Sequence, residues 1–277
     1  MDRSRRGFRC IASHCLPLMQ QLATETSILG LSLEDLVRSR SYALEMTRDG
    51  ESEHISILGT DAFSIAPAFN ISTIAVASML ASCKKISQIP ADSCVVGVDS
   101  DAGGPQGQVT MPDGRIFHFK PREDGREKEF DRELPILIDT YRHQLSNDQS
   151  NLPRLHGIVV SGSMCIGFLI NRIETFPEGA NLMSPGNWTR STHHTRWEKQ
   201  VKAITEALHA HGLVWGDVNA GNVVIDQHDD AWVIDFGGGN NSWFVDDDKV
   251  ETIEGDLQGV KRLFQEWLPK RRDGIPF

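Results

Sequence analysis

Basic residues are scarce in this 277-residue sequence, and that shortage bears on its partners. There are 28 Lys and Arg against 38 Asp and Glu, giving a formal net charge of −10 at pH 7. Neutralising nucleic-acid phosphates requires clustered Lys and Arg, so the deficit argues against nucleic acid as a partner. The sequence also lacks internal repeats and low-complexity tracts, which argues against a repeat architecture.

The cysteines form neither a CxxC pair nor a zinc-type spacing. There are five of them, widely scattered: Cys10, Cys15, Cys83, Cys94 and Cys165. We therefore expect reduced thiols without a special role and a cytoplasmic location. The basic N-terminal residues precede a weakly apolar segment that His14 and Pro17 interrupt, so a cleaved signal is disfavoured, while organelle import and nuclear entry stay open.

Long apolar runs are also missing, with one segment that needs comment. Residues Ala62–Cys83 carry no charge and are long enough to span a bilayer, but Pro67, Asn70 and several Ser and Thr dilute the run. We expect a buried helix, or a loop followed by a helix, and no membrane partner.

The composition that remains, 39% apolar and 24% charged, is that of a globular protein able to bury a core. We predict an α+β fold with three parts. Residues 1–90 form an N-terminal extension of unknown role, residues 91–173 a lobe built on a sheet, and residues 174–277 a short, mainly helical lobe.

The first two parts contain recognisable element patterns. Helical spacing over Leu33–Met46 follows Ser32 and Asp35, which suit a capping box. The helix Arg126–Tyr141 has one apolar stripe despite Pro135. Apolar segments bounded by turn residues predict a five-stranded antiparallel sheet, made of Cys94–Val98, Gln108–Met111, Arg115–Lys120, Leu155–Ser161 and Met164–Ile173.

The third part begins with a polar stretch. Thr195 and Glu198 then predict the start of a helix that Gly212 ends. A last helix is expected over Asp256–Trp267. Between the two helices we expect three short strands, Leu213–Trp215, Asn222–Asp226 and Ala231–Phe236.

The segment that indicates chemistry is Leu213–Gly239, which reads LVWGDVNAGNVVIDQHDDAWVIDFGGG. Asn222 follows Asp217 after five residues, and Asp235, in Asp-Phe-Gly, follows Asn222 after thirteen. In this order and spacing the sequence resembles the protein-kinase-like superfamily, in particular divergent fungal kinase-like and aminoglycoside-phosphotransferase-like proteins. The resemblance implies a bilobal kinase-like fold, an ATP/Mg²⁺-dependent phosphotransferase, and the cofactors ATP and Mg²⁺.

The resemblance also implies roles for single residues. Asp217 would accept a hydrogen bond from the acceptor hydroxyl, and Asn222 and Asp235 would hold Mg²⁺. Lys120, at the end of its strand, would pair with the nucleotide phosphates. Its carboxylate partner would be Glu133, in Arg-Glu-Leu, although Glu129 lies one turn away on the same helix face and stays open.

Two other features would contact the nucleotide. Gly103, Gly104 and Gly107 lie between the first two strands, where kinases fold a loop over the phosphates, but their spacing is not GxGxxG and a plain loop is an equal alternative. Residues 170–173, with Asn171 and Ile173, resemble the linker whose backbone receives adenine. Asp256 resembles the aspartate that braces the catalytic loop; an ordinary helix cap is the other interpretation, and the two are compatible.

Some positions depart from protein kinases. Trp215-Gly216 replaces the usual His-Arg, and Asn219 stands where serine/threonine kinases have a lysine. These departures favour a small-molecule acceptor over a protein, but the sequence does not identify the acceptor. From Asp217 through Asp256 there are 11 acidic residues and only Lys249 is basic, which favours a cationic acceptor or is simply a solvated face. The alternative function is a silent pseudokinase that senses nucleotide or acts as a scaffold.

Overall fold

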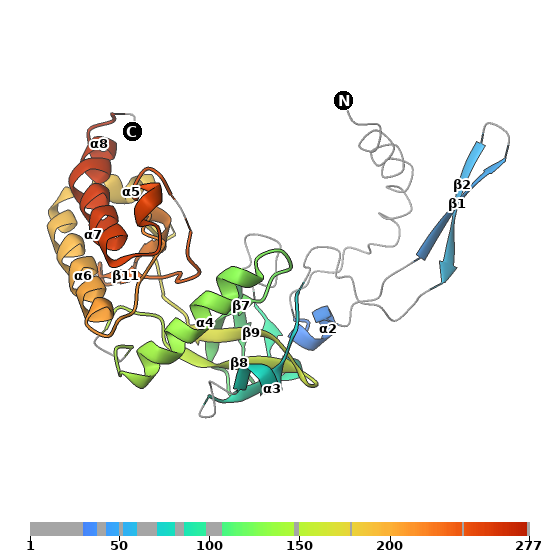
Figure 1. Cartoon of the computed structure of the whole chain (residues 1–277). Helices are drawn as coiled ribbons and strands as arrows, with labels where there is room; N and C mark the ends of the chain where they lie inside the picture. The colour runs from blue at the N-terminus through green and yellow to red at the C-terminus, as the bar shows by residue number, and fades with distance from the viewer. Residues whose placement is uncertain are drawn as a thin grey trace.

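The computed structural model describes residues 30–37, 43–49, 52–59, 71–80, 86–97, 107–146, 150–177, 179–239 and 241–275. Figure 1 shows a sheet with helix α4 across one face, and beside it a mainly helical half that carries α5 to α8. The α+β prediction is confirmed at this level. Among the described residues, no helix is both long and apolar enough to cross a membrane.

The main sheet has seven strands in the order β4-β8-β9-β7-β6-β5, with β3 also paired to β9. Their bounds are β3 Ile74–Ala75, β4 Gln88–Pro90, β5 Val95–Val96, β6 Gly107–Thr110, β7 Ile116–Pro121, β8 Leu155–Ser161 and β9 Met164–Asn171. Since β4 pairs with β8 in parallel, the sheet is mixed, and the predicted five-stranded antiparallel sheet is wrong. The additional strands, β3 and β4, have two and three residues, too few for the alternation that indicates a strand.

Alternate residues of the strands face opposite sides of the sheet and enter two separate cores. On one side, Ile158 and Phe168 pack with the apolar stripe of α4 (Glu127–Arg142). On the other side, Val159 and Leu169 pack with Leu33 from α2 (Leu33–Val37). A sheet covered on both faces is a rigid base for the side chains at its strand ends.

Helix α4 follows the sequence prediction and passes through Pro135 without ending. Its buried stripe is Phe130, Leu134, Leu137 and Ile138, with Glu133 buried beside it. Pro135 lies on the exposed side of the helix, where its ring meets solvent. The proline removes one helical hydrogen bond, and burial of the opposite stripe compensates for that loss.

The N-terminal helix is shorter than its pattern predicts. Ser32 caps it, because its Oγ accepts the N–H of Asp35 at 3.1 Å and Asp35 Oδ2 accepts the N–H of Ser32 at 3.0 Å. The helix α2 nevertheless ends at Val37, and β1 (Ala43–Asp49) pairs with β2 (Ser52–Gly59). The predicted continuation of the helix to Met46 is wrong: Leu44 and Met46 alternate with polar residues, which is the period of a strand.

Within the uncharged segment 62–83, the structure describes residues 71–80, and the rest lies outside the described residues. The described part contains β3 and a short helix, α3 (Val76–Leu80). Val76 packs into the core on the α4 side of the sheet. The predicted helix is therefore present as the short α3, and in the described part a strand of the sheet, not a loop alone, precedes it.

The second half is held together by tryptophans. Its elements are α5 Pro185–Trp188, α6 Ser191–His209, β10 Val223–Ile225, β11 Ala231–Val233, α7 Ile253–Arg262, a π-helical turn Leu263–Trp267, and α8 Leu268–Arg272. The fully buried Trp267 makes edge contacts with Phe244 at 5.9 Å and Trp188 at 6.2 Å between ring centroids. Each large aromatic side chain buries a large apolar area, which helps to stabilise a small helical unit.

Two boundaries differ from the sequence prediction. Helix α6 begins at Ser191, one turn before the predicted Thr195, and α7 begins at Ile253, with Thr252 as its cap. Residues 213–215 are not a strand, because the N–H of Trp215 donates to the Asp256 side chain instead of to a neighbouring strand. The antiparallel pair β10–β11 lies within the two other predicted strands.

Candidate functional site

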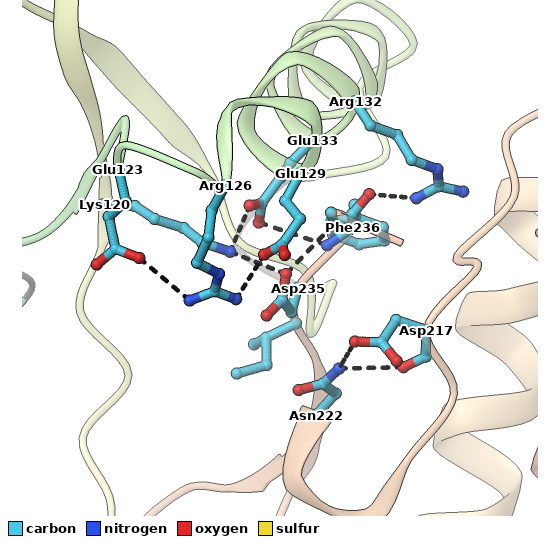
Figure 2. Close-up of polar contacts among 12 residues, drawn as sticks. Lys120, Glu123, Arg126, Glu129, Arg132, Glu133, Asp217, Asn222, Asp235 and Phe236 are labelled. Carbon is cyan, nitrogen blue, oxygen red and sulfur yellow. Dashed lines mark hydrogen bonds and ion pairs between the residues drawn. The ribbon is translucent and has the colours of Figure 1, made fainter. Parts of the chain in front are cut away.

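Lys120 lies at the centre of the candidate site. It is the fifth residue of β7, and its ammonium Nζ lies 2.9 Å from Asp235 Oδ1 and forms an ion pair with Glu133 Oε2 (Figure 2). The strand, the helix α4 and the loop after β11 each supply one of the three groups. Residues separated by more than a hundred positions thus meet in one ion-paired cluster.

The two candidate glutamates of α4 have different partners. Glu133 is buried and turned toward Lys120, while Glu129 has 42% of its side chain exposed and pairs with Arg126 at 2.5 Å. The two positions lie one turn apart on the same helix face, but only Glu133 is buried. The structure brings Glu133, and not Glu129, to Lys120.

One ammonium shared by two carboxylates explains the charge states in this cluster. Burial alone would lower the pKa of Lys120, but the charges of Glu133 and Asp235 raise it. Burial raises the pKa of Glu133, with the Asp235 charge acting in the same direction and Lys120 opposing it. Burial also acts to raise the pKa of Asp235, yet the charge and hydrogen bond of Lys120 outweigh it and the pKa is lowered. Lys120 therefore remains charged and Asp235 stays ionised.

Asp235 has an unusual backbone. Its φ of +60° places a non-glycine residue in the left-handed region. Such a conformation costs about 1–3 kcal/mol and persists only when its surroundings hold it in place. Here the N–H of Gly237 donates to Asp235 Oδ1 at 3.3 Å, and the N–H of Phe236 donates to Glu133 Oε1 at 3.4 Å. The strained residue is thereby tied to the same cluster as Lys120.

Asp217 lies on a loop that two asparagines shape. Asn222 Nδ2 donates to Asp217 Oδ2 at 2.7 Å, and Asn219 Nδ2 donates to Asp217 Oδ1 at 3.1 Å. Asn219 Oδ1 in turn accepts the N–H groups of Gly221 and Asn222 and caps a short 3₁₀ turn, Ala220–Asn222. Burial is the main cause that raises the pKa of Asp217; the two amides oppose it, and the charges of Asp235 and Glu129 add to it.

The fully buried Asp256 braces the same loop from α7. Its two carboxylate oxygens accept the N–H groups of Trp215 and Gly216, each at 2.8 Å, and Oδ2 also contacts His209 Nε2 at 2.8 Å. Since Thr252 caps the helix, the bracing position predicted for Asp256 is confirmed and the helix-cap interpretation is wrong. Two charge-assisted bonds to consecutive backbone amides fix the residue immediately before Asp217.

Two oxygens in the site have no hydrogen-bond partner among the described residues. The amide nitrogen of Asn222 is engaged by Asp217, which leaves its Oδ1, and Asp235 uses Oδ1 toward Lys120, which leaves its Oδ2. Carboxylate and amide oxygens are ligands of the kind that Mg²⁺ accepts alongside phosphate oxygens and water. Within the described part of the chain, no group of three or more His, Cys, Asp or Glu could hold a metal alone. The residues present therefore fit a metal only if a phosphate-bearing ligand completes its coordination.

A cavity adjoins the cluster on the side of β7 and the start of α4. Lys120, Pro121, Glu123, Arg126, Glu129 and Phe130 line it. The guanidinium of Arg126 is held between Glu123 at 3.2 Å and Glu129 at 2.5 Å (Figure 2). Lys120 and Arg126 thus give this cavity two cationic groups.

The remaining sequence predictions concern residues expected to contact the nucleotide. Gly103 and Gly104 lie outside the described residues, and Gly107, predicted as the end of the loop, is the first residue of β6. The side chain of Asn171 is used within the sheet, where its Oδ1 accepts the N–H of Arg154 at 2.6 Å. Among the described residues, no hydrogen bond joins the backbone N–H or C=O of Ile173 to another residue.

Sequence reasoning missed two side chains of this site. Asn219 was noted only as a departure, yet it organises the Asp217 loop. Arg132 was noted only as part of Arg-Glu-Leu, yet its guanidinium reaches the loops of both aspartates. Nothing in the sequence pattern marks either residue. Arg132 binds backbone carbonyls, which any residue provides, and Asn219 binds backbone amides in addition to the Asp217 carboxylate.

A scan of known protein families found no model that matches this chain, and a search of curated proteins found no match.

Proposed function

We propose that the protein is an ATP- and Mg²⁺-dependent phosphotransferase of the protein-kinase-like fold that transfers the γ-phosphate of ATP to a hydroxyl group. One observation carries the proposal: Lys120 lies between Glu133 and Asp235, and Asp235 is within electrostatic range of Asp217 on the neighbouring loop. Phosphoryl transfer asks a protein mainly for alignment and charge stabilisation, and these groups are suited to both.

Each group has a role that its surroundings support. Lys120, kept charged, binds phosphate oxygens, and Glu133 keeps the ammonium in place. Asp235 Oδ2 and Asn222 Oδ1 would hold Mg²⁺, and the bound ion would supply positive charge against the charge that develops on the phosphates. Asp217 accepts a hydrogen bond from the acceptor hydroxyl and orients it for in-line attack.

The order of elements supports the kinase-like fold within this proposal. A sheet carrying Lys120 is followed by α4 with Glu133, then by the Asp217 loop, the hairpin β10–β11 and Asp235. The proposal assigns the backbone N–H and C=O of Ile173, which follows the last strand of the sheet, to binding the nucleobase. The acceptor is a small molecule or a protein.

A second candidate, a pseudokinase that binds nucleotide without turnover, is favoured by a different observation. Both carboxylate oxygens of Asp217 already accept amide protons, and a Cβ on Gly239 would lie 3.0 Å from Asp217 Oδ1. The segment after Asp235 therefore lies against the carboxylate that the acceptor must reach. If that contact persists when nucleotide binds, transfer is blocked.

Thermal unfolding with MgATP tests the binding step that both candidates share. At a hundred times the dissociation constant, we expect the melting temperature of the full chain to rise by about 5 °C or more, and ATP without Mg²⁺ to give less. Asp235→Asn should lose the Mg²⁺-dependent part. The control is Asp139→Asn, an exposed carboxylate of α4 that pairs with Arg142, and it should behave like the wild type.

Absence of any shift or binding heat in the wild type would overturn the proposal. Where MgATP binds, incubation with labelled ATP and a panel of hydroxyl-bearing amines and basic peptides separates the candidates. A phosphorylated product supports the phosphotransferase. Binding without any product across the panel supports the pseudokinase.

A further inference from the structure

Arg132 occupies a position that the proposed chemistry does not use directly. It precedes Glu133 on α4, and its side chain is 20% exposed and points away from Lys120, toward the second half of the molecule (Figure 2). Its Nη1 donates to the carbonyl of Trp215 at 3.0 Å and also to the carbonyl of Phe236, and its Nη2 donates to the carbonyl of Val214 at 3.2 Å.

These carbonyls belong to the two loops of the candidate site. Val214 and Trp215 lead into Asp217, and Phe236 directly follows Asp235. A guanidinium is a planar fork with five N–H donors, so one arginine can bind several carbonyls at fixed angles. A lysine ammonium, as a compact point charge, lacks that geometry.

Two glycines provide the room for this side chain. Gly216 has φ +79°, and a Cβ there would lie 2.8 Å from Arg132 Cζ. Gly238 also has φ +79°, and a Cβ there would lie 3.0 Å from Arg132 Cδ. A side chain at Gly216 would therefore collide with Arg132, and one at Gly238 would crowd both Arg132 and Glu251.

A third segment joins the same residue. Glu251 Oε2 lies 3.6 Å from Arg132 Nε, and Glu251 belongs to the stretch between Asp235 and α7. Its side chain is half-exposed, so we assign this ion pair a smaller effect than the carbonyl bonds.

We propose that Arg132 is a positioning residue that fixes the loops of Asp217 and Asp235 to helix α4, so that Glu133 and both aspartates are placed together. Displacing α4 then disturbs the Lys120–Glu133 pair and both loops at once. The catalytic consequence rests on the proposed phosphotransfer. The mechanical link does not, because it can be measured without nucleotide.

Hydrogen exchange of the full chain, without ATP or Mg²⁺, tests the link. In Arg132→Met we expect the backbone amides of residues 215–217 and of residues 236–238 to exchange about tenfold faster or more, equivalent to about 1.4 kcal/mol. The matched control is Arg142→Met on the same helix, whose ion pair with Asp139 is exposed; exchange in both loops should stay unchanged.

Arg132→Lys keeps the positive charge and supplies a second test should the methionine variant fail to fold. We expect it to protect the two loops only in part. Wild-type exchange in either loop of a folded Arg132→Met or Arg132→Lys protein would overturn the inference, as would an equal increase in Arg142→Met.

Kinetics separate positioning from simple destabilisation once transfer is measured. Well below the melting temperature, Arg132→Met should lower kcat about tenfold or more, and KM for MgATP should rise as well, because the loosened loop carries Asp235. Arg132→Lys should recover part of kcat. An unchanged kcat together with faster hydrogen exchange in the loops would overturn the positioning role. If the wild-type protein transfers no phosphate, the proposed function is refuted, and the exchange experiment alone decides whether Arg132 links the two loops to α4.

Discussion

Asp217 and Asp235 lie in the same site but in opposite electrostatic surroundings. Asp235 accepts a hydrogen bond from an ammonium, and its pKa is lowered. Asp217 accepts hydrogen bonds from two neutral amides, and burial raises its pKa. The difference therefore comes from the partner each carboxylate has, since both are partly withdrawn from solvent.

This contrast indicates a division of labour. A carboxylate whose pKa is lowered stays ionised and is suited to hold a metal, whereas one whose pKa is raised has a greater affinity for a proton and is suited to accept a hydrogen bond from a hydroxyl. Two carboxylates whose pKa values are shifted in opposite directions are common in active sites where one carboxylate binds a ligand and the other takes part in proton transfer. Within the proposed function, that rule supports assigning Asp235 to the metal and Asp217 to the acceptor hydroxyl.

Replacing Asp217 is expected to have the largest effect on transfer and tests whether the two aspartates have separate roles. In Asp217→Asn we expect kcat for transfer to fall about 10²–10⁴-fold, because the acceptor hydroxyl loses its hydrogen-bond acceptor. The affinity for MgATP should stay within a few-fold, since Asp235 and Lys120 are intact. Steady-state assays with labelled ATP and calorimetry on the same protein give the two numbers.

An exposed carboxylate provides the control for that variant. Asp139→Asn should leave both kcat and affinity unchanged. If Asp217→Asn turns over as fast as the wild type, Asp217 has no part in orienting the acceptor. If it loses MgATP affinity to the same degree as Asp235→Asn, the two aspartates do not have separate roles.

The pH dependence of transfer and of nucleotide binding tests the opposite pKa shifts of the two aspartates. As the pH falls, Asp217 with its raised pKa gains a proton first, and Asp235 with its lowered pKa gains one later. We therefore expect kcat/KM to decrease on the acid side at a pH where Mg²⁺-dependent nucleotide binding is still intact. Activity and binding measured across the same pH series should give two separate transitions, with the loss of transfer at the higher pH. Coincident transitions, or the reverse order, would contradict the assignment.

The same pKa directions predict how the two groups affect stability. Asp235 has a folded-state pKa below its unfolded value, so it stabilises the protein above the unfolded pKa, and that contribution is lost as the pH falls through the folded pKa. Asp217 has a folded-state pKa above its unfolded value, so its ionisation destabilises the folded protein, and this cost disappears as the pH falls below the unfolded pKa. The free energy of unfolding near neutral pH thus contains a cost for keeping Asp217 ionised.

How far the sequence could predict this site depended on the kind of interaction. The spacing of Asp217, Asn222 and Asp235 is local and predicted a site. Of these three residues, the structure brings Asp235 to Lys120, and it pairs Asn222 with Asp217. The helix stripe of α4 and the hairpin β10–β11 were also predicted, because periodicity shows in segments of sufficient length.

The misses involve interactions that leave no pattern. Strands β3 and β4 are too short to alternate, and the segment before Asp217 looks like a strand until its amides are seen to bond to Asp256. Arg132 contacts backbone carbonyls from three-dimensional proximity alone. The mixed sheet and the link through Arg132 were therefore beyond sequence reasoning.

Removing the charge of Glu129 is expected to have the smallest effect on activity, and it tests how nearby charges shift the pKa of Asp217. Glu129 adds to the raised pKa of Asp217 only as the weakest of its causes, and its own ion pair with Arg126 is largely exposed. In Glu129→Gln we expect the acid limb of kcat/KM to move slightly toward lower pH, and the free energy of unfolding to change by less than about 1 kcal/mol. The matched variant Glu133→Gln, at the buried partner of Lys120, should instead weaken MgATP binding. Because the two glutamates lie one turn apart on one helix, an equal loss of MgATP affinity in both would mean that burial and pairing with Lys120 do not decide which one serves the nucleotide site.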